Sequence, residues 1–135
     1  MFTDIHNCCM LLGTADDILI LCHKSPDGDT IGAAYGLYHA LTQLGRRAAV
    51  RCSDPLPEKF AYIHGGIEMP EFEPQLIIAV DIAGPGLLGP ALEQYADRVD
   101  LCIDHHVSNS DYAGLTLLDA QAAAAVSYTH LTLPT

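Results

Sequence analysis

Acidic and imidazole side chains gather in this sequence at the points where three apolar segments end. They are His23, Asp27 and Asp29 after residues 17–22, Asp81 after residues 75–80, and Asp104, His105 and His106 after residues 99–103. Carboxylates crowded into one crevice would repel one another and raise their own pKa values unless cations neutralised them. Oxygen and imidazole ligands without sulfur are typical of manganese or magnesium, with iron or cobalt as alternatives and a structural zinc disfavoured.

A pair of metal ions is the simplest occupant of such a crevice. Asp81 is alone at the end of its segment, and we expect it to bridge two ions about 3.5–4 Å apart. That spacing activates a water molecule and stabilises the oxygens of an in-line displacement at phosphorus. The pattern therefore predicts hydrolysis of a phosphate ester or anhydride.

Four nearly continuous apolar segments predict the strands that would position these side chains. Such runs are typical of parallel strands covered on both faces. The predicted strands are residues 17–22, 47–52, 75–80 and 99–103. Weaker patterns predict helices near residues 2–12 and 58–63. We expect one α/β domain, a mainly parallel sheet flanked by helices.

The clearest helical pattern covers residues 30–45, between the first two predicted strands. Apolar side chains recur there every three to four positions, with Asp29 or Thr30 as the N-cap and Gly45 as the stop. A helix in this place makes a βαβ unit and so favours parallel strands. Its N-terminus would point at the carboxyl edge of the sheet, where ligands of open α/β sheets bind and where a phosphate is favoured.

The loop "HKSPDGD" (residues 23–29) joins the first predicted strand to this helix. Pro26 and Gly28 would shape the turn so that Asp27 and Asp29 face the same cavity. The absence of a side chain at Gly28 also permits a close approach of the backbone. The loop is therefore expected to deliver two carboxylates to one site.

The composition is strongly acidic, with 6 basic and 17 acidic residues and a formal charge of −11. Such a surface repels a long nucleic acid, so a phosphate partner requires the local reversal of charge that a bound metal supplies. The five cysteines are odd in number and lack C-x-x-C spacing, which favours reduced thiols. Without an apolar run of about 18 residues or a positively charged leader, we expect a cytoplasmic protein that does not bind membranes.

Three motifs together resemble those of the DHH family of phosphoesterases, over residues 14–125. They read "HKSPDGD", "VDIA" and "IDHHVSN", and the triplet that names the family is found here at residues 104–106. The resemblance implies the Rossmann-like N-terminal domain of that family. It also implies two manganese ions, with Mg²⁺ or Co²⁺ as alternatives, and no organic cofactor.

The same resemblance implies a role for each candidate residue. His106 would face the substrate phosphate, and Asp104 would orient the histidines from behind. The implied metal ligands are His23, Asp27 and Asp81 for the first ion, and Asp29, Asp81 and His105 for the second.

Within the family, "PDGDTIGA" and "DHHVSN" are most similar to the branch of nano-RNases and 3′-phosphoadenosine 5′-phosphate phosphatases. This branch implies small substrates: short oligoribonucleotides, dinucleotides or 3′-phosphoadenosine 5′-phosphate. Cyclic-di-AMP phosphodiesterases overlap with it in substrates. Manganese inorganic pyrophosphatases fit less well, because they carry threonine at the position of Gly28. A homodimer is compatible with the full-length protein.

The end of the chain departs from the family pattern. The family has a further metal-binding aspartate downstream of the triplet, but no acidic residue follows Asp119 here. Residues 126–135 ("VSYTHLTLPT") resemble the translation of a sequencing-library adapter, with an alternating strand as the other interpretation. We therefore expect a helical lead at 1–13, a partial domain at 14–125 and a non-native tail at 126–135. A catalytically incomplete metal-binding fragment is the alternative to an active phosphoesterase.

Overall fold

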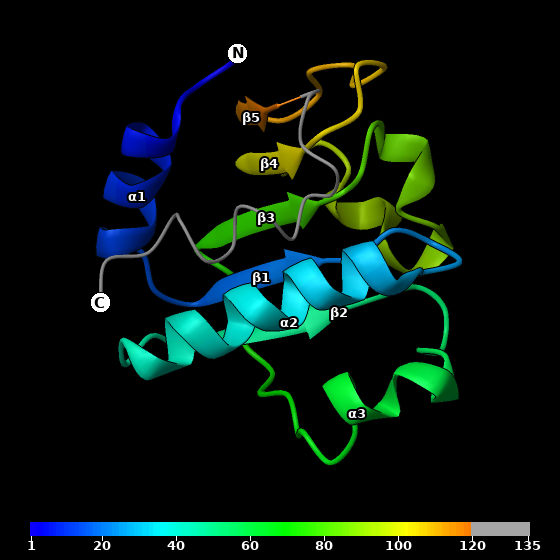
Figure 1. Ribbon diagram of the computed structural model, residues 1–135. Coiled ribbons are helices and arrows are strands. Elements are labelled where there is room, and N and C mark those ends of the chain that lie inside the picture. Colours follow the sequence, from blue (N-terminus) through cyan, green and yellow to red (C-terminus); the bar gives the residue numbers. More distant parts are fainter. Residues whose placement is uncertain (120–135) are drawn as a thin grey trace.

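Five parallel strands form a single sheet in the computed structural model, which describes residues 1–119 (Figure 1). The strand order is β2-β1-β3-β4-β5. Their bounds are β1 Ile18–Leu21, β2 Ala48–Arg51, β3 Leu76–Val80, β4 Leu101–Asp104 and β5 Leu115–Leu118. Every neighbouring pair is parallel, which confirms the predicted α/β class. The tail expected at 126–135 lies outside the described residues.

Strand β5 was not predicted from the sequence. It has only four residues, and it pairs with β4 in the register Leu101 with Leu115. The N-terminus covers its outer edge, because the amide of Thr3 donates to the carbonyl of Thr116 at 2.9 Å. The amide of Thr116 in turn donates to the carbonyl of Met1 at 2.8 Å. A strand this short takes its stability from both neighbours, which local sequence does not reveal.

Helix α2 spans Gly28–Gln43 and follows β1 directly. Its N-cap is Asp27, whose carboxylate accepts the backbone N–H of Thr30 at 3.0 Å. The prediction that Asp29 or Thr30 caps the helix is therefore wrong, because both lie within the first turn. The predicted stop is confirmed: Gly45 has a φ of +80°, which only glycine adopts freely.

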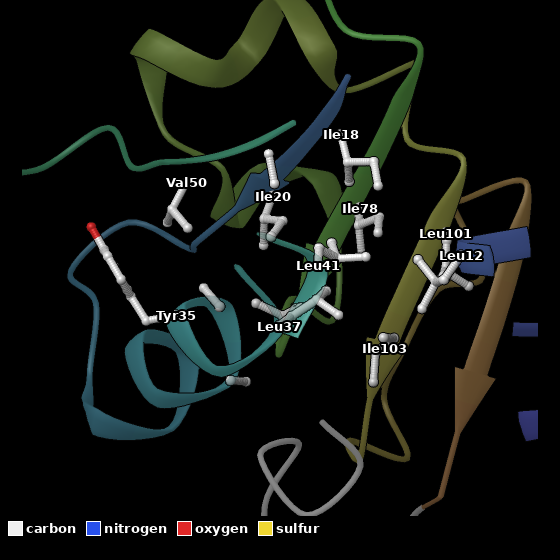
Figure 2. Close-up of a cluster of buried hydrophobic side chains, with 14 of the residues drawn as sticks. Leu12, Ile18, Ile20, Tyr35, Leu37, Leu41, Val50, Ile78, Leu101 and Ile103 are labelled. Atoms are coloured by element: carbon white, nitrogen blue, oxygen red, sulfur yellow. The ribbon is translucent and has the colours of Figure 1, made fainter. Parts of the chain in front are cut away.

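Helices cover one face of the sheet. Helix α1 (Ile5–Thr14) and helix α2 lie on the same face, and their buried side chains share one cluster with residues of all five strands. Figure 2 shows Leu37 and Leu41 of α2 in one buried cluster with Ile20 and Ile78. This packing fixes the N-terminus of α2 at the tips of the strands (Figure 1).

Short helical turns cover the opposite face. Leu88, which follows turn η2 (Pro85–Leu87), and Leu92 of turn η3 (Pro90–Tyr95) join a second buried cluster with β1, β3 and β4. The segment before β3 contains η1 (Glu58–Phe60) and α3 (Ala61–His64), close to the short helix expected at 58–63. All five cysteines are free. No helix within residues 1–119 is both long and apolar enough to cross a membrane.

Candidate metal centre

The carboxyl ends of β1, β3 and β4 lie side by side, because these strands are direct neighbours in the sheet. Two groups of closely spaced ligand atoms result, and Asp81 belongs to both. Within each group the ligand atoms lie within 4.8 Å of one another. The groups are His23 with Asp27 and Asp81, and Asp104 with His105, His106 and Asp81. The remaining predicted residue, Asp29, joins the second group through His105.

Asp81 occupies the centre of the site, one residue after β3. Asp81 is only 4% exposed, and its backbone N–H donates to the carbonyl of Ile103 at 2.9 Å. Its φ of +62° is uncommon for a residue with a side chain, and such conformations concentrate at functional positions. Burial raises the pKa of Asp81, but hydrogen bonds with His23 and Asp29 and the nearby rings of His106 and His105 outweigh it and lower this pKa below its usual range.

His23 and Asp27 form the open side of the site. The Nε2 atom of His23 lies 3.6 Å from a carboxylate oxygen of Asp27 and 3.6 Å from one of Asp81. Its Nδ1 atom lies 2.7 Å from the carbonyl of Lys24, which accepts its proton. The contact with Asp81 raises the pKa of His23 to about 9. The ring is therefore oriented with Nε2 toward the carboxylates.

His105 and Asp29 form the closed side. The Nε2 atom of His105 lies 2.9 Å from Asp81 and 3.0 Å from Asp29. Burial lowers the pKa of His105, but the negative charges of Asp81 and Asp29 outweigh it and raise this pKa. Asp29 lies in the first turn of α2, so the helix carries it to the end of β4.

Asp104 lies behind the two histidines and is fully buried. One of its oxygens accepts the backbone N–H of His105 at 2.8 Å and faces Nδ1 of His106 at 2.6 Å. The other accepts the side-chain amide of Asn109 at 2.8 Å. Both oxygens are thus engaged by protein groups. This arrangement leaves Nε2 of His106 as the ring nitrogen available to a ligand.

Thr30 is a structural part of the site that the sequence did not reveal. Its hydroxyl donates to the carbonyl of Val80 at 3.0 Å, and its side chain is fully buried. This bond ties the first turn of α2 to the last residue of β3. Asp27, Asp29 and Asp81 are held together by it. A threonine inside a helix turn carries no signal for this role unless the partner strand is known.

A cavity of about 440 Å³ opens over the group of His23, Asp27 and Asp81 and reaches His106. This volume is in the range of small-molecule sites. Its lining residues are His23, Lys24, Ser25, Asp27, Asp81, Ala83, Leu87, His106 and Ser108.

Comparisons with known proteins agree with this arrangement. Residues 17–132 match the DHH family, N-terminal domain. The bifunctional oligoribonuclease and PAP phosphatase NrnA of Thermus thermophilus is 33% identical over 113 residues. The match covers 79% of this chain and 33% of that protein, so the chain spans about a third of this curated relative.

A solved structure has the same fold. The exopolyphosphatase-related protein from Bacteroides fragilis superposes with a TM-score of 0.81 at 21% identity. The superposition covers 93% of this chain and 41% of the other. At this identity the likeness concerns the fold alone.

Proposed function

The chain belongs to the DHH family, and from this membership we propose that it is the metal-binding domain of a phosphoesterase. The reaction is the hydrolysis of a phosphate ester of a small nucleotide. The observation that carries the proposal is the position of Asp81, a buried carboxylate shared by two groups of ligand atoms from β1, β3 and β4. A carboxylate shared by two groups of ligand atoms can bridge a pair of ions, which supports a two-metal site.

The residues fit divalent metal ions by their chemistry. Oxygen and imidazole nitrogen are the donors that manganese prefers, and no cysteine belongs to either group. His23 also donates its second ring N–H to a backbone carbonyl, a feature typical of metal-ligating histidines. The proposed ligands are His23, Asp27 and Asp81 for one Mn²⁺, and Asp29, Asp81 and His105 for the other. Bound ions would lower the pKa of water and neutralise charge on the phosphoryl group.

The remaining groups act on the substrate and on the ligands themselves. Asp104 holds the proton of His106 on Nδ1, so Nε2 is presented to a phosphate oxygen. It also fixes His105 through the backbone N–H. Asn109 satisfies the other oxygen of Asp104, which prevents the carboxylate from rotating out of place. We propose His106 as the substrate contact and Asp104 as its positioning residue.

Several properties favour small substrates over long nucleic acids. The cavity has the volume of a small-molecule site, and the formal charge of −11 opposes a polyanion. The relative from Thermus thermophilus is described as an oligoribonuclease and PAP phosphatase. We propose short oligoribonucleotides, dinucleotides and 3′-phosphoadenosine 5′-phosphate as substrates. A cytoplasmic location and a homodimer are parts of the same proposal.

A metal-binding domain without activity of its own is the second candidate. The chain spans about a third of its curated relative. Both candidates keep the group of His23, Asp27 and Asp81. The two candidate functions differ in whether the second group, with Asp81, Asp104, His105 and His106, suffices for turnover.

Phosphate release in the presence of Mn²⁺ tests the proposal. The assay would use 3′-phosphoadenosine 5′-phosphate and a linear dinucleotide, with this chain and with a longer version carrying the downstream region of the gene. We expect Mn²⁺ binding by both and turnover at least by the longer version. Turnover by the longer version alone selects the second candidate for this chain. Mn²⁺ binding without turnover of any phosphate ester by either version would contradict the proposed function.

A further inference from the structure

Five of the six lysine and arginine side chains have a partner within the described residues. Their partners are backbone carbonyls, carboxylates or an aromatic ring. They are Arg46 with Gly13, Arg47 with Asp17, Arg51 with Pro70, Lys59 with the ring of Phe60, and Arg98 with Glu73. The side chain of Lys24 makes no ion pair or hydrogen bond in residues 1–119. Among the lysine and arginine side chains of residues 1–119, the one left for a ligand is therefore the one that lines the metal cavity.

Lys24 lies on the boundary between two hollows. It lines the cavity of about 440 Å³ that contains His23, Asp81 and His106. It also lines an adjoining cavity of about 310 Å³, whose other lining residues, Glu93 among them, all belong to the segment between β3 and β4. Glu93 forms no ion pair with Lys24. The lysine is thus positioned at the outer limit of the metal cavity rather than at its floor.

The backbone of Lys24 is held in place although its side chain is exposed. Its N–H donates to the carbonyl of Leu87 at 2.7 Å, and its carbonyl accepts the ring N–H of His23 at 2.7 Å. Gly89 has a φ of +84° and comes so close that an added Cβ would lie 3.2 Å from Cβ of Lys24. The backbone of Lys24 is therefore held at the edge of the cavity, and its exposed side chain can reach a ligand there.

We propose that Lys24 binds a second, non-reacting phosphate of the substrate. This inference rests on the proposed function, in which the reacting phosphate lies against the ligands on β1, β3 and β4. In a chain with a formal charge of −11, a phosphate outside the metal site needs a cation of its own. Lys24 therefore selects nucleotides with two phosphate groups over those with one.

The test compares the binding of two nucleotides by isothermal titration calorimetry in the presence of Mn²⁺. The probes are the bisphosphonate analogue of 3′-phosphoadenosine 5′-phosphate, which carries two phosphate-like groups, and the 5′-phosphonate analogue of adenosine 5′-monophosphate, which carries one; the P–C bonds of both resist hydrolysis. A single phosphate goes to the metal ions, because they carry the larger charge. Lys24→Gln is expected to weaken binding of the first probe by about tenfold, the effect of one charge-assisted hydrogen bond. Binding of the second probe should change by less than about twofold.

Two further variants make the result specific. Lys59→Gln removes the same charge from another exposed lysine, 5.2 Å from the Phe60 ring and outside the cavity, and should change neither affinity. Lys24→Arg keeps the charge and should retain most of the discrimination. Added salt should reduce the preference for two phosphates in wild type and leave Lys24→Gln unchanged.

Three outcomes would overturn the inference. They are an unchanged preference in Lys24→Gln, an equal loss for both probes, or wild-type protein that does not favour the probe with two phosphates. The proposed function is tested separately by phosphate release. If wild type discriminates through Lys24 but releases no phosphate, the proposed function fails and this binding role stands.

Discussion

The two ends of the parallel sheet both carry aspartates, but their partners differ. Strand β4 shows this within five residues, since Asp100 precedes it and Asp104 ends it. Asp100 is exposed and accepts a backbone N–H from Ile77 at 2.9 Å. Asp104 is fully buried and holds two histidine residues and Asn109. The carboxylate of Asp100 links β3 to the start of β4, whereas the carboxylate of Asp104 orients the two histidines.

Strand β1 repeats the contrast. At its amino end, Asp16 accepts the backbone N–H of Arg47 at 2.7 Å, and Asp17 pairs with the guanidinium of Arg47 at 2.5 Å. Backbone hydrogen bonds from Arg47 and from Asp17 lower the pKa of Asp16. At the carboxyl end, the charged partners within the described residues are histidines. An arginine neutralises an acid permanently, but a histidine can release its proton to a metal ion. The ion pairs at the amino end therefore stabilise the fold, whereas the histidines at the carboxyl end can exchange a proton for a metal ion.

Asp81→Asn is expected to have the largest effect of any substitution at the carboxyl end. The amide cannot serve as an anionic bridge, so both groups of ligand atoms lose their shared member. Turnover by an active version should fall on the order of a thousandfold, and Mn²⁺ affinity should fall at both positions. Asp100→Asn at the amino end is the matched control and should change Mn²⁺ affinity by less than about twofold. Near-normal activity of Asp81→Asn would refute the shared-carboxylate site.

Asp104→Asn should have the next largest effect, although we place Asp104 outside the proposed ligand sets. The amide turns one acceptor into a donor, which conflicts with the N–H groups that now point at both oxygens. A loss of about 10–100-fold in Mn²⁺ affinity or turnover is typical of groups that orient ligands. Calorimetry with Mn²⁺ and circular dichroism separate lost binding from lost folding. A folded variant with unchanged affinity and unchanged turnover would remove Asp104 from the site.

Manganese affinity should depend on pH at the carboxyl end. In the metal-free protein, Asp81 raises the pKa of His23 to about 9, so this ring is protonated at neutral pH and must lose its proton to bind a metal. Affinity should therefore fall by about tenfold per pH unit as the pH drops from 9 toward 7. Calorimetric titrations at pH 7, 8 and 9 would measure the slope. His23→Gln should make it shallower, and an affinity independent of pH would contradict the exchange role.

The sequence sufficed for the part of the fold that depends on local pattern. Four of the five strands and the stop at Gly45 follow from apolar runs and from glycine chemistry. The seven candidate residues all gather at one edge because parallel strands align their carboxyl ends. What local pattern could not supply are relations between distant segments. Strand β5 depends on β4 and the N-terminus, and Thr30 acquires its role only from Val80.

The N-cap of α2 shows the same limit at a single residue. Asp27, Asp29 and Thr30 all have side chains that can cap a helix. The choice falls on Asp27 because the bond between Thr30 and Val80 fixes where the first turn begins. The Asp29 carboxylate, which is not used as the N-cap, lies instead against the ring of His105. The tertiary contact thus decides which carboxylate caps and which one faces the histidine.

Asp17→Asn, at the amino end, should have the smallest effect. Asparagine tolerates the left-handed conformation of this residue, whose φ is +50°, so the change removes the ion pair with Arg47 and leaves the turn intact. Both partners lie at the surface, where ion pairs contribute little and salt screens them. We expect a slightly lower melting temperature at low ionic strength, no difference at high salt, and a Mn²⁺ affinity within about twofold of wild type. A large loss of Mn²⁺ affinity in a folded Asp17→Asn variant would mean that the two ends of the sheet are coupled, and the division between them would have to be abandoned.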